Sequence, residues 1–298
     1  MKKRVRSVDL SLFSDDLLLV VMSYLGSNDL HRVSRCAQRM VDLCGPQFKT
    51  LVLQSHERSR RSQDKPMFAI QTDMAVFSIM QKRWNVNKLV VRDERVVPGL
   101  VHALITGCCS DIVDLDVDMI TDKMDERFTS LSAALSRRSF EFTTCRPLTH
   151  LTLRRVSSGR GLRQLLRSSF AGRHLQEIHI VSSLDTSQAS DLGSFLKCNC
   201  PPNLRVLEVT GDMSYVFWGS HPIQALIHAS RSNRCIHIER ISMPKLRVRH
   251  WMLEDLASAI ETKTAFPRLK SLSLCHYDFD GSLKARFQEM GVDAVLTI

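Results

Sequence analysis

The sequence predicts an α/β fold in which a short strand and a helix alternate along most of the chain. A hexapeptide with apolar residues at its first, fourth and sixth positions recurs. In the segments between these hexapeptides, apolar residues are spaced as in amphipathic helices. A proline precedes three of the hexapeptides. Residues 1–45 are expected to form a separate helical segment, and residues 46–298 are expected to form the strand–helix domain.

Eight hexapeptides are expected to form the strands. Within each one, apolar and polar residues alternate, as they do in a strand that is buried on one face. Their fourth residues lie 26 to 38 positions apart, which is near the length of one strand plus one helix. The hexapeptides are Phe48–Leu53, Val86–Val91, Ile112–Val117, Leu148–Leu153, Leu175–Ile180, Leu204–Val209, Ile238–Met243 and Leu269–Leu274.

The segments between the strands are expected to be helices on the outer side of the sheet. Residues 161–170 and 250–261 both place apolar side chains at helical intervals, with polar side chains on the opposite side. A proline stands just before three of the hexapeptides, where it ends the preceding helix and favours an extended backbone. These prolines are Pro147, Pro202 and Pro267.

This strand–helix recurrence resembles the leucine-rich repeats, most closely in residues 200–209 and 266–274. The resemblance covers about residues 48–274 and implies a curved solenoid, with a parallel sheet on its concave face and helices outside. The family often has Asn or Cys three residues after the last apolar strand residue. This chain instead has His56, Glu94, Ile120, Val156, Ser183, Asp212, Leu246 and Tyr277. The turns therefore need other hydrogen-bond partners, and an ordinary α/β domain is the alternative.

Two short antiparallel helices are expected within residues 13–43, before the repeats. Ser14 is placed to cap the first helix, and Gly26 ends it. Ser27 or Asn28 caps the second helix. Because a solenoid needs a cap over its first strand, a plain helical cap is one interpretation of this segment.

The same segment also resembles the F-box, since a Leu-Leu pair, an apolar pair, a Leu and an Asp-Leu follow one another in the order of that motif. The resemblance implies a substrate-receptor subunit of a cullin–RING (SCF-type) ubiquitin ligase. Its F-box would bind the Skp adaptor, and its repeats would hold a protein target. The residues implied to contact the adaptor are Leu17, Leu18, Val21, Leu25, Leu30 and Val33. The sequence departs from the motif in three places: Phe13-Ser14 stands for the usual Leu-Pro, Met40 stands for the aromatic residue near the end, and no third helix is evident before residue 48.

The composition limits the class of protein. With 298 residues, 44% of them hydrophobic and 24% charged, the chain can bury a large core. A net charge of +10 favours anionic partners, but twelve glycines argue against glycine-rich phosphate loops. Nine scattered cysteines lack the spacing of zinc sites, so reduced thiols in the cytoplasm or nucleus are expected. No stretch has the length expected of a membrane span.

No sequence motif for catalysis, nucleotide binding or metal binding is present. Cys108 and Cys109 lie near His102 in the sequence, and buried thiols account for them better than a nucleophile does. His221 and His228 are seven residues apart without a second pair of metal ligands. The sequence therefore predicts no enzyme, no cofactor and no metal site.

The target is expected to bind the concave face, at the alternate strand positions that point away from the core. Acids on one strand neighbour His and Arg on the next, and this mixed polarity suits a protein better than a nucleic acid, which requires a uniformly basic face. The residues predicted to bind the target are Asp114, Asp116, His150, Arg154, His179 and Glu208.

Three functions fit these observations. The first is the ubiquitin-ligase receptor. The second is a leucine-rich-repeat interaction scaffold whose N-terminal helices only cap the repeats. The third is an enzyme on an irregular α/β fold, which a single pocket that gathers Cys and His would support.

Overall fold

The computed structural model describes residues 50–54, 68–69, 86–92, 96–106, 111–118, 130–131, 133–134, 146–156, 174–213, 221–276 and 281–297. The N-terminal segment 1–45 and the helix expected at residues 161–170 lie outside the described residues.

The strands are β1 (Thr50–Gln54), β2 (Phe68–Ala69), β3 (Lys88–Val91), β4 (Asp114–Asp118), β5 (His150–Arg154), β6 (Glu177–Val181), β7 (Val206–Val209), β8 (Arg240–Val248), β9 (Ser271–His276) and β10 (Asp293–Thr297). The helices are α6 (Val97–Ile105), α9 (Thr186–Asn199), α10 (Pro222–Arg231), α11 (His250–Glu261) and α12 (Gly281–Glu289).

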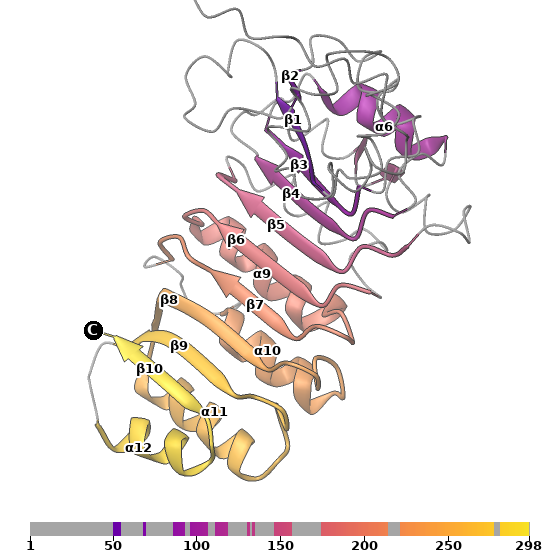
Figure 1. Cartoon of the computed structure of the whole chain (residues 1–298). Helices are drawn as coiled ribbons and strands as arrows, with labels where there is room; N and C mark the ends of the chain where they lie inside the picture. Colours follow the sequence, from indigo (N-terminus) through magenta and orange to yellow (C-terminus); the bar gives the residue numbers. More distant parts are fainter. Residues whose placement is uncertain are drawn as a thin grey trace, which may run out of the picture.

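The strands form one parallel sheet. From β3 to β10 each strand lies beside the next one in the chain, so the order in the sheet follows the sequence (Figure 1). The order differs at the N-terminal edge, where β1 lies between β3 and the two-residue strand β2. The predicted α/β class and the parallel pairing of the hexapeptides are confirmed.

The eight hexapeptides pair in the register that their shared pattern implies. Their fourth residues lie opposite one another across the sheet, and β10 extends the same row by one residue. In order, the row is Leu51, Leu89, Leu115, Leu151, Ile178, Leu207, Ile241, Leu272 and Ala294. Because a slip of one residue would turn every side chain to the other face, this register keeps the apolar sets of β3–β9 on one side.

Strands β5, β6 and β7 bury alternate side chains, whereas every residue of β3 and β4 after the first is buried. In β5, Leu151 and Leu153 are fully buried, while His150, Thr152 and Arg154 are only partly buried. The buried set faces the helices and the partly buried set lies on the opposite face of the sheet.

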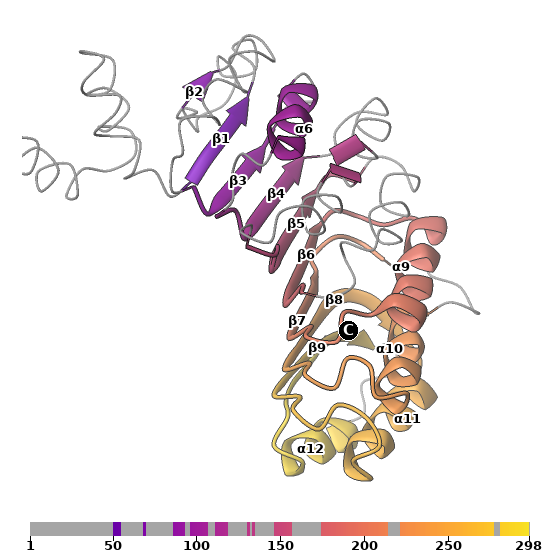
Figure 2. The same cartoon turned by 90° about the vertical axis from the view of Figure 1, so that its right-hand side faces the viewer.

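The helices cover the apolar face of the sheet. Figure 2 shows α6, α9, α10 and α11 on one side of the curved sheet, which is its convex side. Leu196 of α9, Leu226 of α10 and Leu256 of α11 are fully buried in the same core as the strands. Burial of each such side chain contributes about 1.5–3 kcal/mol. Helix α11 confirms the helix expected at residues 250–261.

The starts of successive strands are joined by a recurring pair of backbone hydrogen bonds. The carbonyl of Asn87 accepts from the N–H groups of Val113 and Asp114, at 2.9 and 3.0 Å. Five further carbonyls accept from two consecutive N–H groups of the following strand in the same way. They are those of Val113, Thr149, Gln176, Arg205 and Glu239. These bonds fix where each strand begins relative to its neighbour, and so they hold the register.

The first residues of α9 and α10 satisfy their free N–H groups differently. At α9, a carboxylate oxygen of Asp185 accepts from the N–H of Gln188 at 2.8 Å, and the Gln188 side chain accepts from the N–H of Asp185 at 2.9 Å. This reciprocal pair is a capping box. At α10, Nδ1 of His221 accepts from the N–H of Ile223 at 3.3 Å, and Pro222 is the first helical residue.

The turns after β6 and β7 are joined by hydrogen bonds and by a close backbone contact. The N–H of Asp212 donates to the hydroxyl of Ser183 at 3.2 Å, and the N–H of Leu184 donates to the carbonyl of Asp212 at 2.9 Å. The two turns touch so closely that a Cβ atom on Gly211 would lie 1.8 Å from the carbonyl oxygen of Ser182. A serine hydroxyl and a glycine therefore allow the two turns to pack against each other.

Candidate functional site

The face of the sheet opposite the helices, called the open face below, carries the residues predicted to bind a target. These are Asp114, Asp116, His150, Arg154, His179 and Glu208, all at the strand positions that alternate with buried ones. Asp114 lies opposite His150 on the next strand, and His179 lies opposite Glu208. The structure therefore brings the six together on one surface.

Asp116 lies between two arginines from the neighbouring strands. Arg92 donates to its two carboxylate oxygens at 2.9 and 3.2 Å, and Nε of Arg154 reaches the same oxygens at 2.9 and 3.2 Å. Burial alone would raise the pKa of the Asp116 carboxyl, but the hydrogen bonds and charges of Arg154 and Arg92 outweigh it and hold that pKa below its usual value. Only 3% of Asp116 is exposed. A partner on the open face would therefore meet the two guanidinium groups rather than this carboxylate.

A second buried carboxylate lies two residues further along β4. Asp118 is 2% exposed and accepts from Nε of Arg155 at 2.9 Å, with a second contact from the same guanidinium group. Arg155 follows β5 with a positive φ of 49°, and this left-handed backbone turns its side chain back toward β4. Two acids are thus covered by three arginines at the carboxyl ends of β3–β5.

Histidines and glutamates form a chain across β5, β6 and β7. Nε2 of His150 lies 3.5 Å from Glu177, and Nε2 of His179 lies 3.3 Å from the same carboxylate. Nδ1 of His179 lies 3.0 Å from Glu208. When it is protonated, His179 donates to two carboxylates at once, and these side chains are about one-third exposed. This chain is polar, connected and accessible to a partner.

Further ion pairs lie beside the arginine–aspartate cluster and the histidine–glutamate chain. Nζ of Lys88 lies 2.7 Å from Asp114 on the neighbouring strand. Where β7, β8 and β9 begin, Glu239 accepts from Arg205 at 2.8 Å and from Lys270 at 2.9 Å, and these bonds lower the pKa of Glu239 to about 2. The side chains of Arg205 and Lys270 are largely exposed, so their ion pairs with Glu239 contribute little to the stability of the fold. Their main effect is on the arrangement of charges at the surface.

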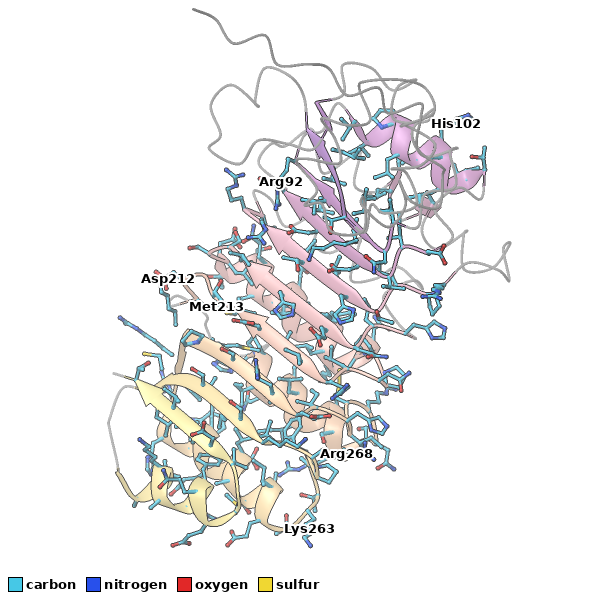
Figure 3. The ribbon with its side chains drawn as sticks, viewed as in Figure 1. Arg92, His102, Asp212, Met213, Lys263 and Arg268 are labelled. Carbon is cyan, nitrogen blue, oxygen red and sulfur yellow. A yellow bond between two sulfur atoms is a disulfide. The ribbon has the colours of Figure 1, made fainter. Side chains whose placement is uncertain are left out.

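Arg92 and Arg155 contribute to the open face and were not predicted from the sequence. Arg92 (labelled in Figure 3) stands three residues after Leu89, as Arg154 stands after Leu151. Extending the strand alternation by two residues would have found it. Arg155 has no such signal, because its position depends on a left-handed backbone that the pattern does not encode.

A groove between α9 and α10 on the outer side brings Cys and His together. It has a volume of about 420 Å³, and its lining includes Lys197, Cys198, His221 and His228. His221 is 3% exposed, and burial lowers the pKa of its imidazole, although a hydrogen bond to the Arg247 carbonyl opposes this. Its Nδ1 caps α10 and its Nε2 lies 3.4 Å from that carbonyl. Both ring nitrogens are therefore engaged in structural bonds, and His221 is not placed as a base for the Cys198 thiol.

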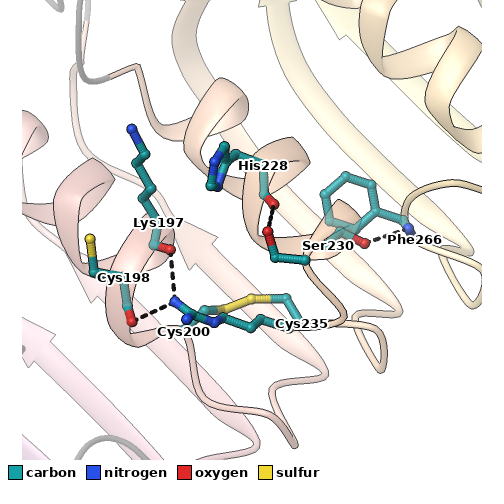
Figure 4. Close-up of a disulfide and its surroundings, with 9 residues drawn as sticks. Lys197, Cys198, Cys200, His228, Ser230, Cys235 and Phe266 are labelled. Atoms are coloured by element: carbon teal, nitrogen blue, oxygen red, sulfur yellow. Dashed lines mark hydrogen bonds between the residues drawn. A yellow bond between two sulfur atoms is a disulfide. The ribbon is translucent and has the colours of Figure 1, made fainter.

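A disulfide joins the two helices beside this groove (Figure 4). Cys200 at the end of α9 is bonded to Cys235 in the loop after α10, with 6.1 Å between their Cα atoms. Nη1 of Arg234 also donates to the carbonyl of Cys198 at 2.8 Å. The expectation that the cysteines are reduced is therefore wrong for this pair, while Cys198 and Cys275 are free thiols.

The structure does not test the predicted adaptor contacts. The residues implied to contact the adaptor lie outside the described part of the chain: Leu17, Leu18, Val21, Leu25, Leu30 and Val33. In the described part, no group of three His, Cys, Asp or Glu side chains is placed to hold a metal ion. Nor does any described helix have both the length and the apolar character that crossing a bilayer requires.

Comparison with known proteins gives little similarity. No family model and no curated protein matches the sequence. Among solved structures, the chain aligns with a crystal structure of a protein from Bacteroides fragilis, over 77% of this chain and 72% of that one. The sequence identity is 13% and the TM-score is 0.38, a likeness too weak to carry an argument.

Proposed function

We propose that the chain is a leucine-rich-repeat solenoid that serves as a substrate-receptor subunit of a cullin–RING ubiquitin ligase. Its N-terminal segment binds the Skp adaptor, and its open face binds a protein target. The observation that carries the binding of a protein target is the network of alternating charges across β3–β7, on a face that no described helix covers.

Three features of the fold support a repeat solenoid. The strands follow the order of the sequence from β3 to β10, and their central residues share one row. The paired hydrogen bonds at the strand starts recur from strand to strand. The described helices lie on the convex side, which leaves the concave side to a partner (Figure 2).

The open face suits a protein partner. Its acids and bases alternate between neighbouring strands, so a partner must present a complementary pattern rather than a uniform charge. Such complementarity chiefly provides specificity. A nucleic acid would instead require a basic face along its whole path.

The ligase role rests on the F-box-like order of residues in the N-terminal segment. A receptor of this kind performs no chemistry itself. It holds a target lysine near the ubiquitin-charged enzyme and so raises the effective concentration of that lysine. A few apolar anchors on short helices are enough for a specific contact with an adaptor.

Co-expression with a Skp adaptor tests the proposal. The parent chain is expected to capture the adaptor from a tagged purification. A double variant, Leu25→Asp with Leu30→Asp, is expected to lose that capture because it places two charges in the proposed contact. The matched control adds two charges elsewhere, through Ile105→Asp and Trp251→Asp, at positions that are 36% and 42% exposed. This control is expected to capture the adaptor as the parent does.

Equal capture by the parent and the Leu25/Leu30 variant would contradict the ligase role. Failure of the parent to capture any adaptor would also contradict it, and would favour the second candidate, a scaffold whose N-terminal helices only cap the solenoid. The open face supports that candidate equally, since a scaffold uses the same surface to bind its partner.

A further inference from the structure

One cation on the open face differs from the others. From β3 to β5, Lys88, Arg92 and Arg154 each bind a carboxylate on a neighbouring strand. Arg240, the first residue of β8, is exposed, and its guanidinium group has no ion pair or hydrogen bond with any other described residue. Its five N–H donors are therefore available to a ligand.

Three serines occupy the strand positions next to Arg240 on the same face of the sheet. Ser271 is the register partner of Arg240 on β9, Ser242 lies two residues further along β8, and Ser273 is the register partner of Ser242. All three are partly buried, and their hydroxyl groups make no hydrogen bond with another described residue. Adjacent strands are about 5 Å apart and alternate residues about 7 Å apart. The four residues therefore stand at the corners of a patch of about 5 by 7 Å, which is wide enough for one small anion.

Acids on both sides limit what this patch can accept. Glu208, held by His179, is the register partner of Ser242 on β7, and the exposed Asp293 is the register partner of Ser271 on β10. Glu239, which precedes Arg240, is occupied by Arg205 and Lys270. A single negative group would meet one guanidinium and three hydroxyls, whereas a run of negative groups would meet Glu208 and Asp293.

We propose that Arg240, Ser242, Ser271 and Ser273 form a subsite for one anionic side chain of the target, either a carboxylate or a phosphorylated serine or threonine. The subsite rests on the proposed role of the open face in holding a protein. A guanidinium group binds either anion through two parallel N–H donors, and hydroxyls donate to the remaining oxygens. The flanking acids select targets in which the anionic residue has neutral or basic neighbours.

Titration of the full chain with short peptides tests this subsite. The probes are three capped peptides Gly-Ala-X-Ala-Gly, in which X is phosphoserine, glutamate or serine, together with inorganic phosphate. Saturation-transfer NMR measures their dissociation constants. The phosphoserine or glutamate peptide is expected to bind at least tenfold more tightly than the serine peptide. Arg240→Gln is expected to weaken that binding roughly tenfold, because it removes a charged hydrogen-bond donor.

Arg268→Gln is the matched control, since Arg268 is an exposed cation in the loop before β9 (Figure 3). It removes the same charge from outside the patch and is expected to leave binding unchanged. Preference for phosphoserine over glutamate identifies a phosphorylated target, and equal binding of the two identifies any single anion. Equal affinity of the serine peptide, or equal weakening by both substitutions, would overturn the subsite.

The outcome is independent of the adaptor test. If the chain binds the anionic peptides but captures no adaptor, the ligase role is contradicted and the subsite belongs to a scaffold protein. Adaptor capture with no anion preference removes the subsite alone. The thermal unfolding midpoint of Arg240→Gln is expected to equal that of the parent, because the side chain is exposed. Equal midpoints show that the variant is folded.

Discussion

At the scale of single residues, Asp116 illustrates how this sheet tolerates a buried charge on its open face. A carboxylate removed from water loses several kcal/mol of solvation unless charged partners replace the water. Arg92 and Arg154 do so from the flanking strands, each through two hydrogen bonds. The three side chains thereby tie β3, β4 and β5 together on the side where no helix lies.

Asp116→Asn is expected to lower the free energy of unfolding by about 1.5–3 kcal/mol at pH 7, because it weakens the charged hydrogen bonds to two partly exposed guanidinium groups. The folded-state pKa of Asp116 lies below its usual value of 3.8. Its stabilisation is therefore present above pH 4 and is lost as the pH falls through the folded pKa. The difference between parent and variant in urea denaturation should narrow below about pH 4.

Asp111→Asn provides the comparison. Asp111 forms a 3.5 Å ion pair with Arg146 in which both side chains are well exposed, so its removal is expected to have little effect. If both variants denature at the same urea concentration as the parent, the cluster around Asp116 has no stabilising role.

At the scale of the elements, the strands β3–β9 and the helix α11 were predictable, whereas the contacts that depend on turns and helix ends were not. The period-2 pattern identifies β3–β9 and places the six predicted residues on the open face, because alternation fixes which side chains share a face. Strand β2 escaped prediction since two residues carry no period. The disulfide did too, because it depends on how closely the ends of α9 and α10 approach. Which cation reaches which acid likewise depends on turn geometry, as Arg155 shows.

The turn between β7 and the next helix gives an element-scale prediction. Gly211→Ala is expected to destabilise the fold by about 1–3 kcal/mol, because its Cβ would lie 1.8 Å from backbone oxygen and the neighbouring turn must move. Gly281→Ala, at the start of α12, is the control, since no atom lies within 4 Å of its added Cβ. Thermal denaturation of the two variants should show a lower midpoint for Gly211→Ala alone. A similar midpoint for both would mean that the two turns are not in contact.

At the scale of the whole molecule, each strand–helix unit is held mainly by its two neighbours. Strand β6 pairs with β5 and β7, and the helices after successive strands lie side by side on the outer face (Figure 2). The covalent link between Cys200 and Cys235 therefore joins two consecutive units on the helical side, opposite the ion pairs that join strands on the open side.

Loss of this disulfide is expected to lower the free energy of unfolding by about 2–4 kcal/mol, because it closes a loop of 35 residues in the unfolded chain. Urea denaturation of Cys235→Ser should therefore show an earlier midpoint than that of the parent. Cys198→Ser removes an exposed free thiol and should leave the midpoint unchanged. Parent protein treated with a reductant should match Cys235→Ser, and a midpoint insensitive to both treatments would contradict a structural role for the bond.

The agreement between strand order and chain order has a consequence for how the protein is made. A nascent chain leaves the ribosome from its N-terminus, and β3–β10 then appear in the order in which they pair. Each new strand can add to an edge that already exists, without waiting for a later part of the chain. Strand β1 is different, because both of its partners, β2 and β3, are synthesised after it. Assembly during translation can therefore proceed in one direction from β3 onward, with the growing edge of the sheet serving as the template for each unit that follows.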